Sequence, residues 1–255
     1  MVAAQPSDED RMRIQVDAQL SALGDSVNRL LQRAESQMKG QNPPVVRRNL
    51  SELPEKSTPL FIFVEFEACA CTLHTEHTLA PAAAHTDDRI VRQAELEKLR
   101  MPLSQAMRDL EAAGAALAPG FALFAEQCCL RGASLNVLSR GFKDIIRHFL
   151  RAEGLGHVQV LANDLVVPAS GGAWAPCFRD NTATGHDKRR SLKRAAGDGC
   201  TVLIGSAEDD GGVVRAGLVD LAYSVPETAF ARSCRQAEIE TRPFSSWEAL
   251  AAELL

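Results

Sequence analysis

Short apolar runs alternate with amphipathic segments through most of the chain. Five runs rich in aliphatic and β-branched residues, at 60–64, 133–138, 158–162, 200–204 and 221–223, have the composition of buried strands. Between and after them, apolar positions recur at helical spacing at 87–116 (broken by Pro102), 121–131, 143–153, 188–196 and 214–219. Strands that alternate with helices in this way predict an α/β fold, a three-layer doubly wound parallel sheet.

The most apolar of these runs ends at two acids. L-F-I-F-V at residues 60–64 is followed by Glu65 and Glu67, with one residue between them. That spacing places both side chains on the same side of an extended strand. Open α/β sheets bind their ligands beyond the carboxyl ends of their strands. The sequence therefore predicts a paired-carboxylate site at the mouth of the sheet.

The first 58 residues differ from the rest of the chain. Apolar residues recur every three or four positions from Met12 to Ala34, which predicts an amphipathic helix with a narrow apolar stripe. Prolines at 43, 44, 54 and 59 predict an extended linker behind it. A single helix cannot bury its own stripe, so we expect this helix to dock on another protein chain. A solvated tail is the alternative.

Composition narrows the class of protein. The formal net charge of −5 argues against a nucleic-acid partner. No apolar run approaches the length of a membrane span, and the N-terminus lacks the apolar core of a signal peptide. Seven cysteines without a disulfide rhythm favour free thiols in a reducing compartment. We therefore expect an intracellular protein, cytoplasmic by default, with an organelle as the alternative.

Several short motifs, in chain order, resemble those of the haloacid-dehalogenase-like (HAD-like) hydrolases, in the phosphoserine-phosphatase-like branch with a small helical cap. They are E-F-E at 65–67, L-S-R-G-F at 138–142, T-G-H-D-K-R at 184–189 and I-G-S-A-E-D-D at 204–210. The ending P-F-S-S-W-E-A-L at 243–250 is also similar. The resemblance covers residues 59–255. It implies a Rossmannoid domain with a helical cap insertion at about 73–118, preceded by the N-terminal helical extension at 1–58.

The resemblance also implies roles for particular residues. In this family the first acid of the opening motif attacks the phosphorus and the second protonates the leaving group. These catalytic positions correspond to Glu65 and Glu67. Phosphate binding corresponds to Ser139 and Lys188. A Mg²⁺ ion, if one is still bound, would be held by Glu65, Glu67, Asp209 and Asp210.

The chain departs from the family pattern where the chemistry is most demanding. Glu stands in place of Asp at both catalytic positions, and the extra methylene moves each carboxylate by an amount that can cost about a hundredfold in rate. Ala68 stands in place of a turn glycine, and Ser206 in place of a metal-binding Asp. A neutral hydroxyl is a poor substitute for a carboxylate at a hard-cation site.

These departures favour a catalytically inactive HAD-like protein that is a structural or accessory subunit of a larger assembly, docked through its N-terminal helix and without a cofactor. One alternative is a Mg²⁺-dependent phosphomonoesterase that acts on a small phosphorylated metabolite. Another is a sensor that binds a phosphate ligand through Ser139 and Lys188 without turnover. In the inactive protein, Lys188 would cap the acidic mouth of the sheet and Ser139 would cap the next helix.

Two further patterns have plain structural explanations. Cys69, Cys71, His74 and His77 could in principle bind zinc, but tetrahedral sites usually draw two pairs of ligands from more distant turns. Thiols packed near the strand end and exposed histidines are the simpler expectation. We also expect a structural rather than catalytic role for His186.

Overall fold

The computed structural model describes residues 53–55 and 57–255. The predicted helix Met12–Ala34 lies outside the described residues, and its docking role stays a prediction. In the described part of the chain, no helix is both long enough and apolar enough to cross a membrane.

Seven strands form one sheet among the described residues, in the order β4-β3-β2-β1-β5-β6-β7. They are β1 (Leu60–Val64), β2 (Ser134–Phe142), β3 (Gln159–Val166), β4 (Ala175–Cys177), β5 (Cys200–Gly205), β6 (Leu221–Ser224) and β7 (Arg242–Pro243). Neighbouring strands are parallel except for the antiparallel pair β3 and β4. The predicted parallel α/β sheet is confirmed, with the first predicted strand at its centre.

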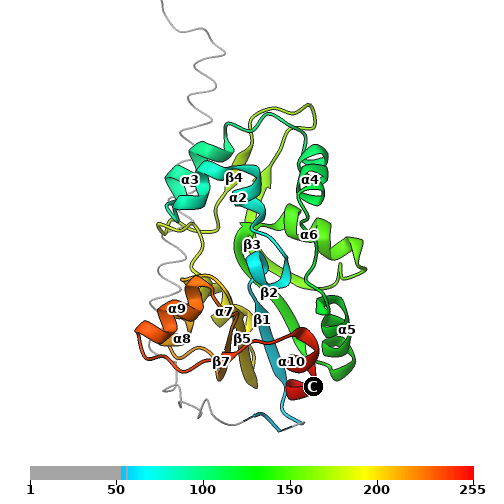
Figure 1. The fold of residues 1–255 in the computed structure, drawn as a ribbon, viewed down its shortest axis with the longest axis vertical. Helices are drawn as coiled ribbons and strands as arrows, with labels where there is room; N and C mark the ends of the chain where they lie inside the picture. Colours follow the sequence, from blue (N-terminus) through cyan, green and yellow to red (C-terminus); the bar gives the residue numbers. More distant parts are fainter. Residues whose placement is uncertain (1–52, 56) are drawn as a thin grey trace, which may run out of the picture. The chain divides into compact units, whose positions relative to one another are not determined.

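Helices cover both faces of the sheet (Figure 1). On one side lie α5 (Phe121–Arg131), α6 (Lys143–Ala152) and α10 (Trp247–Leu254), and on the other α7 (Lys188–Ala195), α8 (Asp210–Arg215) and α9 (Ala229–Gln236). The central strand β1 contributes side chains to both hydrophobic cores: Ile62 and Val64 pack on the first side and Phe63 on the second. A strand buried on both faces needs a continuous apolar run, which residues 60–64 supply.

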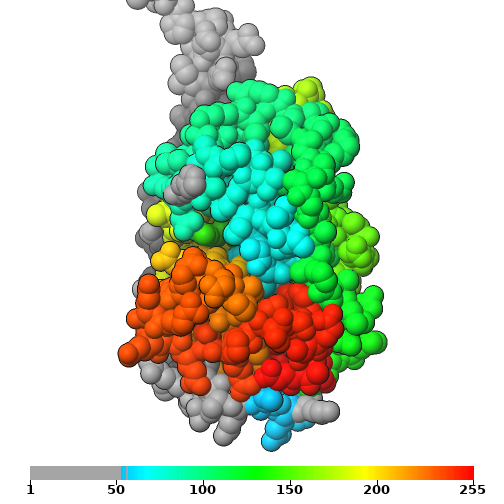
Figure 2. Space-filling view, viewed as in Figure 1, coloured from blue at the N-terminus to red at the C-terminus, as the bar shows by residue number. Residues whose placement is uncertain are grey.

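The segment between β1 and β2 carries further helices. It contains η1 (Phe66–Ala70), α2 (Thr75–Leu79), η2 (Pro81–His85), α3 (Arg89–Leu96) and α4 (Leu103–Ala112), followed by α5. The helices α2, α3 and α4 lie with β4 beyond the end of the sheet at which β1 finishes (Figure 1). In the space-filling view this segment, cyan to green, forms a block beside the orange and red C-terminal elements (Figure 2). We call α2, η2, α3 and α4 the cap segment.

Several local expectations were wrong. Residues 74–86, for which the sequence pattern predicts no helix or strand, contain α2 and η2, each only five residues long and therefore too short to show periodicity. The helix expected at 214–219 is α8, which begins at Asp210. Its first turn was not predicted because it contains Gly211 and Gly212, and glycine has a low helix propensity. The short strand β4 was expected to be loop, and the helices α9 and α10 were not predicted.

Candidate functional site

The six residues predicted for the site lie at the carboxyl edge of the sheet. They are supplied by the end of β1, by β2, and by the starts of α7 and α8. The structure brings them together in one region: Glu65, Glu67, Ser139, Lys188, Asp209 and Asp210.

Lys188 is the hub of this region. Its Nζ donates to Glu65 Oε2, to Asp209 Oδ1 at 3.0 Å and to Asp210 Oδ1 at 2.6 Å. Its side chain is only 1% exposed, so the three contacts lie in a low-dielectric environment where charge pairing is strong. Burial acts to lower the pKa of Lys188, but the three carboxylates outweigh it and hold that pKa above its usual value. The prediction that Lys188 caps the acidic mouth of the sheet agrees with these contacts.

Glu65 uses both of its carboxylate oxygens within the protein. Oε1 accepts hydrogen bonds from the backbone N–H of Phe66 at 2.7 Å and of Glu67 at 3.3 Å, while Oε2 accepts from Lys188. The backbone then makes one wide turn, η1, in which Ala68 has a left-handed conformation with φ of 52°. A non-glycine residue in that region costs about 1–2 kcal/mol. The turn is therefore strained, and both oxygens of its first acid accept hydrogen bonds from the protein.

Glu67 extends from this turn into a pocket. Its carboxylate accepts from the backbone N–H of Thr75 at 2.6 Å and from the Thr75 hydroxyl at 2.7 Å. A Cβ added at Gly141 would lie 3.0 Å from Glu67 Oε1, so a glycine there gives the carboxylate room. Burial raises the pKa of Glu67 to about 8, although the bonds from Thr75 oppose this rise. The group is therefore largely protonated at neutral pH.

The acidic loop after β5 is tied to the first loop by Ser206. The Ser206 hydroxyl donates to the backbone carbonyl of Glu67 at 2.6 Å. Asp210 turns its second oxygen, Oδ2, back onto this loop, where it accepts from the N–H of Ser206 and of Ala207, each at 3.0 Å. Burial raises the pKa of Asp210 to about 7, against the opposing charge of Lys188. Burial also acts to raise the pKa of Asp209, but Lys188 and Arg140 outweigh it and lower that pKa.

These contacts decide how well the site suits the Mg²⁺ ion that the resemblance implies. Glu65, Asp209 and Asp210 each place an oxygen within 4.8 Å of the others, an arrangement of hard ligands that could surround a cation. All three carboxylates, however, already bond to Lys188, and the Glu67 carbonyl already accepts from Ser206. In this arrangement the donor set does not fit Mg²⁺.

A zinc site is not supported either. Among the residues that the structure describes, the acidic trio is the one group gathered closely enough to hold a metal. Cys69 and Cys71 are buried in the apolar core. The rings of His74 and His77 stack on each other with their centroids 4.6 Å apart. Packed thiols and stacked histidines account for this pattern.

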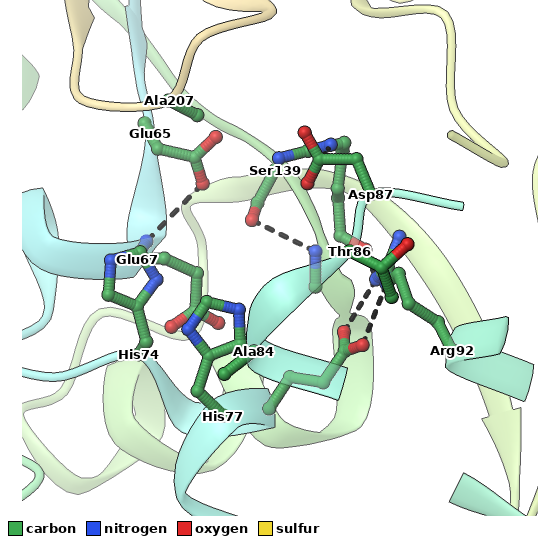
Figure 3. A pocket seen from close by; sticks show the side chains of 13 residues that line it. Glu65, Glu67, His74, His77, Ala84, Thr86, Asp87, Arg92, Ser139 and Ala207 are labelled. Carbon is green, nitrogen blue, oxygen red and sulfur yellow. Dashed lines mark hydrogen bonds and ion pairs between the residues drawn. The ribbon is translucent and has the colours of Figure 1, made fainter. Parts of the chain in front are cut away.

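A small pocket lies between the first loop and the cap segment. It has a volume of about 90 Å³, and its lining includes Glu65, Glu67, Ser139 and the two stacked histidines (Figure 3). Ser139 Oγ accepts from the N–H of Gly141 at 3.0 Å. The next helix, α6, has no side-chain cap, so the expectation that Ser139 caps it was wrong.

Two arginines close the pocket, and the sequence analysis did not identify either. Arg92 of α3 forms a buried ion pair with Glu76 of α2, drawn as two dashed lines in Figure 3. Arg140 of β2 contacts Asp87 of the cap segment at 2.8 Å and Asp209 of the acidic loop at 3.4 Å. The position of Arg140, directly after Ser139 at a strand end, was the one available signal. No pattern pointed to the pair Glu76 and Arg92.

His186 is a buried residue that contacts the backbone of the site residue Ser139. Its ring is 1% exposed; Nδ1 lies 2.7 Å from the carbonyl of Ser139, and Nε2 lies 2.7 Å from the hydroxyl of Ser191. A carbonyl can only accept, so Nδ1 carries the proton, and in the neutral ring Nε2 accepts from Ser191. Burial lowers the pKa of His186 to about 4, with Arg179 and Lys188 acting in the same direction. These contacts agree with the structural role expected for this residue.

The lowered pKa of His186 predicts a loss of stability in mild acid. The unfolded chain takes up a proton near pH 6.5 and the buried ring does not, so unfolding becomes easier as the pH falls. Between pH 7 and pH 5 this group alone should remove about 2 kcal/mol from the free energy of unfolding. His186→Gln should therefore flatten the pH dependence measured by urea unfolding. Equal slopes in wild type and His186→Gln would contradict the prediction.

Comparison with known proteins shows the fold. No family model matches the chain, and no curated protein matches its sequence. Among solved structures, a phosphoserine phosphatase in a phospho-aspartyl intermediate analogue form is similar over 78% of this chain and 100% of that one, at 14% identity and a TM-score of 0.59.

Two further solved structures extend the comparison. A HAD family hydrolase from Salmonella enterica serovar Typhi matches 79% of this chain and 73% of its own, at 11% identity and a TM-score of 0.60. A phosphoserine phosphohydrolase-like protein from Francisella tularensis matches 76% of this chain and 99% of its own, at 14% identity and a TM-score of 0.55. The described part of this chain therefore has the HAD-like fold in its phosphoserine-phosphatase form.

Proposed function

We propose that this protein is a catalytically inactive relative of the HAD phosphatases that acts as a structural or accessory subunit of a larger assembly. The main observation in favour of inactivity is that both carboxylate oxygens of Glu65 accept hydrogen bonds from the protein. Attack requires a carboxylate oxygen to turn toward the substrate, to within about 3–3.5 Å of the reacting atom. Glu65 instead has one oxygen on two backbone N–H groups and the other on Lys188.

The changed metal ligands support the same proposal. Ser206 stands where the family pattern has a metal-binding acid, and its hydroxyl bonds to the Glu67 carbonyl. The three carboxylates nearby share the ammonium of Lys188. Loss of both a free nucleophile and a free metal site affects the same chemical step, whereas the domain around them keeps a complete core.

The first test is hydrolysis of an aryl phosphate in the presence of Mg²⁺. We expect the wild-type protein to release no more phenolate than its Glu65→Gln variant. The triple variant Glu65→Asp, Glu67→Asp, Ser206→Asp, measured beside them, shows whether the family's acids restore turnover on this scaffold. Wild-type turnover that Glu65→Gln abolishes would overturn the proposal.

The runner-up is a Mg²⁺-dependent phosphomonoesterase acting on a small phosphorylated metabolite. Two observations favour it: the close approach of Glu65, Asp209 and Asp210, and the raised pKa of Glu67, which suits a general acid at neutral pH. This alternative needs Lys188 to release the carboxylates when substrate and metal arrive. The hydrolysis test above separates the two functions.

The accessory role rests on the predicted helix Met12–Ala34 and on the apolar stripe that its sequence predicts. Exposed Leu123 and Leu130 on α5, 51% and 88% accessible, also offer apolar surface for contact with another chain. In cell extracts we expect the tagged full-length protein to elute from a sizing column well above its own mass of 27.6 kDa.

Charges placed on the stripe should release the protein from that assembly. The variant Leu20→Asp, Leu23→Asp, Leu30→Asp should elute as the free chain, because aspartate cannot replace leucine in an apolar contact. The matched control, Ser21→Asp, Asn28→Asp, Gln32→Asp, adds the same charge on the opposite side of the predicted helix and should elute like wild type. Identical elution of both variants would count against docking through the stripe.

A further inference from the structure

Three carboxylates crowd together at the carboxyl edge of the sheet. Glu65 and Asp210 are 2% and 0% exposed, and Asp209 is partly covered. Their oxygens approach within 4.8 Å of one another. Like charges held this closely in a buried site repel strongly unless a cation lies among them. A positive charge at this position therefore stabilises the three groups in their ionised form.

Lys188 supplies that charge from within the chain. An ammonium has three N–H donors, and Lys188 directs them to three acceptors, one oxygen from each carboxylate. No donor is left over, and the side chain is almost completely buried. The contacts to Asp209 and Asp210, at 3.0 and 2.6 Å, are those of charge-assisted hydrogen bonds.

Most of the other oxygens of the region also accept hydrogen bonds; Asp209 Oδ2 has only an ion-pair contact with Arg140 at 3.4 Å. Asp210 Oδ2 accepts from two backbone N–H groups, and Glu65 Oε1 accepts from two more. The carbonyl of Glu67 accepts from the Ser206 hydroxyl. Mg²⁺ needs about six oxygens at roughly 2.0–2.1 Å in octahedral geometry. An incoming ion would compete with Lys188 and Ser206 for these oxygens.

We infer that Lys188 is a built-in cation of this site: its ammonium occupies the place among Glu65, Asp209 and Asp210 that a divalent metal ion could take, and the native protein neither needs nor binds one there. A divalent-cation site exists in the same carboxylates only after Lys188 is removed. This inference goes beyond the proposed function, because it concerns charge balance and holds whether or not the protein hydrolyses a phosphoester.

The test compares cation binding by wild type and by Lys188→Met, with Lys143→Met as matched control. Lys143 pairs with Asp164 at the surface, so the control removes an ammonium from an ion pair without touching the site. Binding of Mn²⁺ is followed by electron paramagnetic resonance. Thermal unfolding is measured in EDTA and in millimolar Mg²⁺ at constant ionic strength.

For wild type and Lys143→Met we expect no stoichiometric Mn²⁺ binding and the same Tm in EDTA and Mg²⁺. For Lys188→Met we expect one bound Mn²⁺ per chain and a Tm that Mg²⁺ raises by several degrees. If Lys188→Met folds only when Mg²⁺ is present, the inference is equally supported.

Two results would overturn the inference. The first is one Mn²⁺ bound per wild-type chain together with a Mg²⁺-dependent rise in its Tm. The second is a Lys188→Met protein that folds in EDTA and binds no Mn²⁺. Should Lys188→Met fold under neither condition, the wild-type measurement decides alone: binding refutes the inference and its absence upholds it. Neither the Mn²⁺ binding nor the thermal unfolding experiment measures hydrolysis. A result against this inference is therefore distinguishable from a result against the proposed function.

Discussion

Replacement of Lys188 by methionine is expected to lower the free energy of unfolding by about 3–5 kcal/mol, the usual result of removing one partner from a buried ion pair. Methionine fills a similar volume but leaves Glu65, Asp209 and Asp210 without their shared donor. Urea unfolding in EDTA measures the loss. In a domain of this size it corresponds to a fall in Tm of roughly 6–20 °C.

The loss in Lys188→Met should also depend on pH. Without the ammonium, the buried carboxyls have raised pKa values in the folded state, so the folded variant takes up protons before the unfolded chain does. Its stability deficit is then largest at alkaline pH and shrinks as the pH falls. Lys143→Met, which breaks a surface ion pair, should cost no more than about 1 kcal/mol. A deficit in Lys188→Met that matches this control would contradict the prediction.

The fold could be predicted from sequence because its signals are local and strong. The run at residues 60–64 carries apolar side chains on both faces, and β1 proves to be the central strand with a core on each side. Glu65 and Glu67 follow at the strand end, where the chain turns out of the sheet. The order of strands and helices then leaves few topologies open.

The candidate site could be predicted only as a set of residues. The hydrogen bonds among these residues could not be predicted. They depend on differences of a few ångströms or less in the distances between atoms on loops that lie far apart in the sequence. Glu65 and Lys188 are 123 positions apart, and Ser206 and the Glu67 carbonyl are 139 apart. No periodicity encodes the hydrogen bonds from the N–H groups of the first loop to the Glu65 carboxylate, nor the hydrogen bond from the Ser206 hydroxyl to the Glu67 carbonyl.

The cap segment was the least predictable part for a different reason. Leu96, Met107 and Leu110 of the cap segment pack into the same core as the sheet, but its polar contacts with the domain run through a few long side chains. Arg92 donates to the backbone carbonyls of Thr184 and Arg140, and Arg140 reaches Asp87. Such contacts hold one arrangement of the cap, and that arrangement leaves a pocket of only about 90 Å³. We therefore expect the small size of the pocket to depend on Arg92 and its partner Glu76.

Arg92→Met is accordingly expected to lower the free energy of unfolding by about 3–5 kcal/mol and to loosen the cap segment. The change leaves Glu76 charged and buried without its partner, and two carbonyls lose a donor. The double variant Glu76→Leu, Arg92→Met removes both charges and should be more stable than Arg92→Met alone, with a coupling of about 1–3 kcal/mol. Urea unfolding gives the energies, and hydrogen exchange across residues 75–112 reports loosening of the cap.

Lys98→Met serves as the control, because its pair with Glu95 is exposed and should contribute less than about 1 kcal/mol. Faster exchange confined to the cap segment in Arg92→Met would show that this ion pair holds the pocket closed. Additive energies in the double variant, with exchange unchanged, would mean that the cap is held by its apolar contacts instead. The pocket would then owe its small volume to packing around Leu96 and Leu110, both buried in the same core as the sheet.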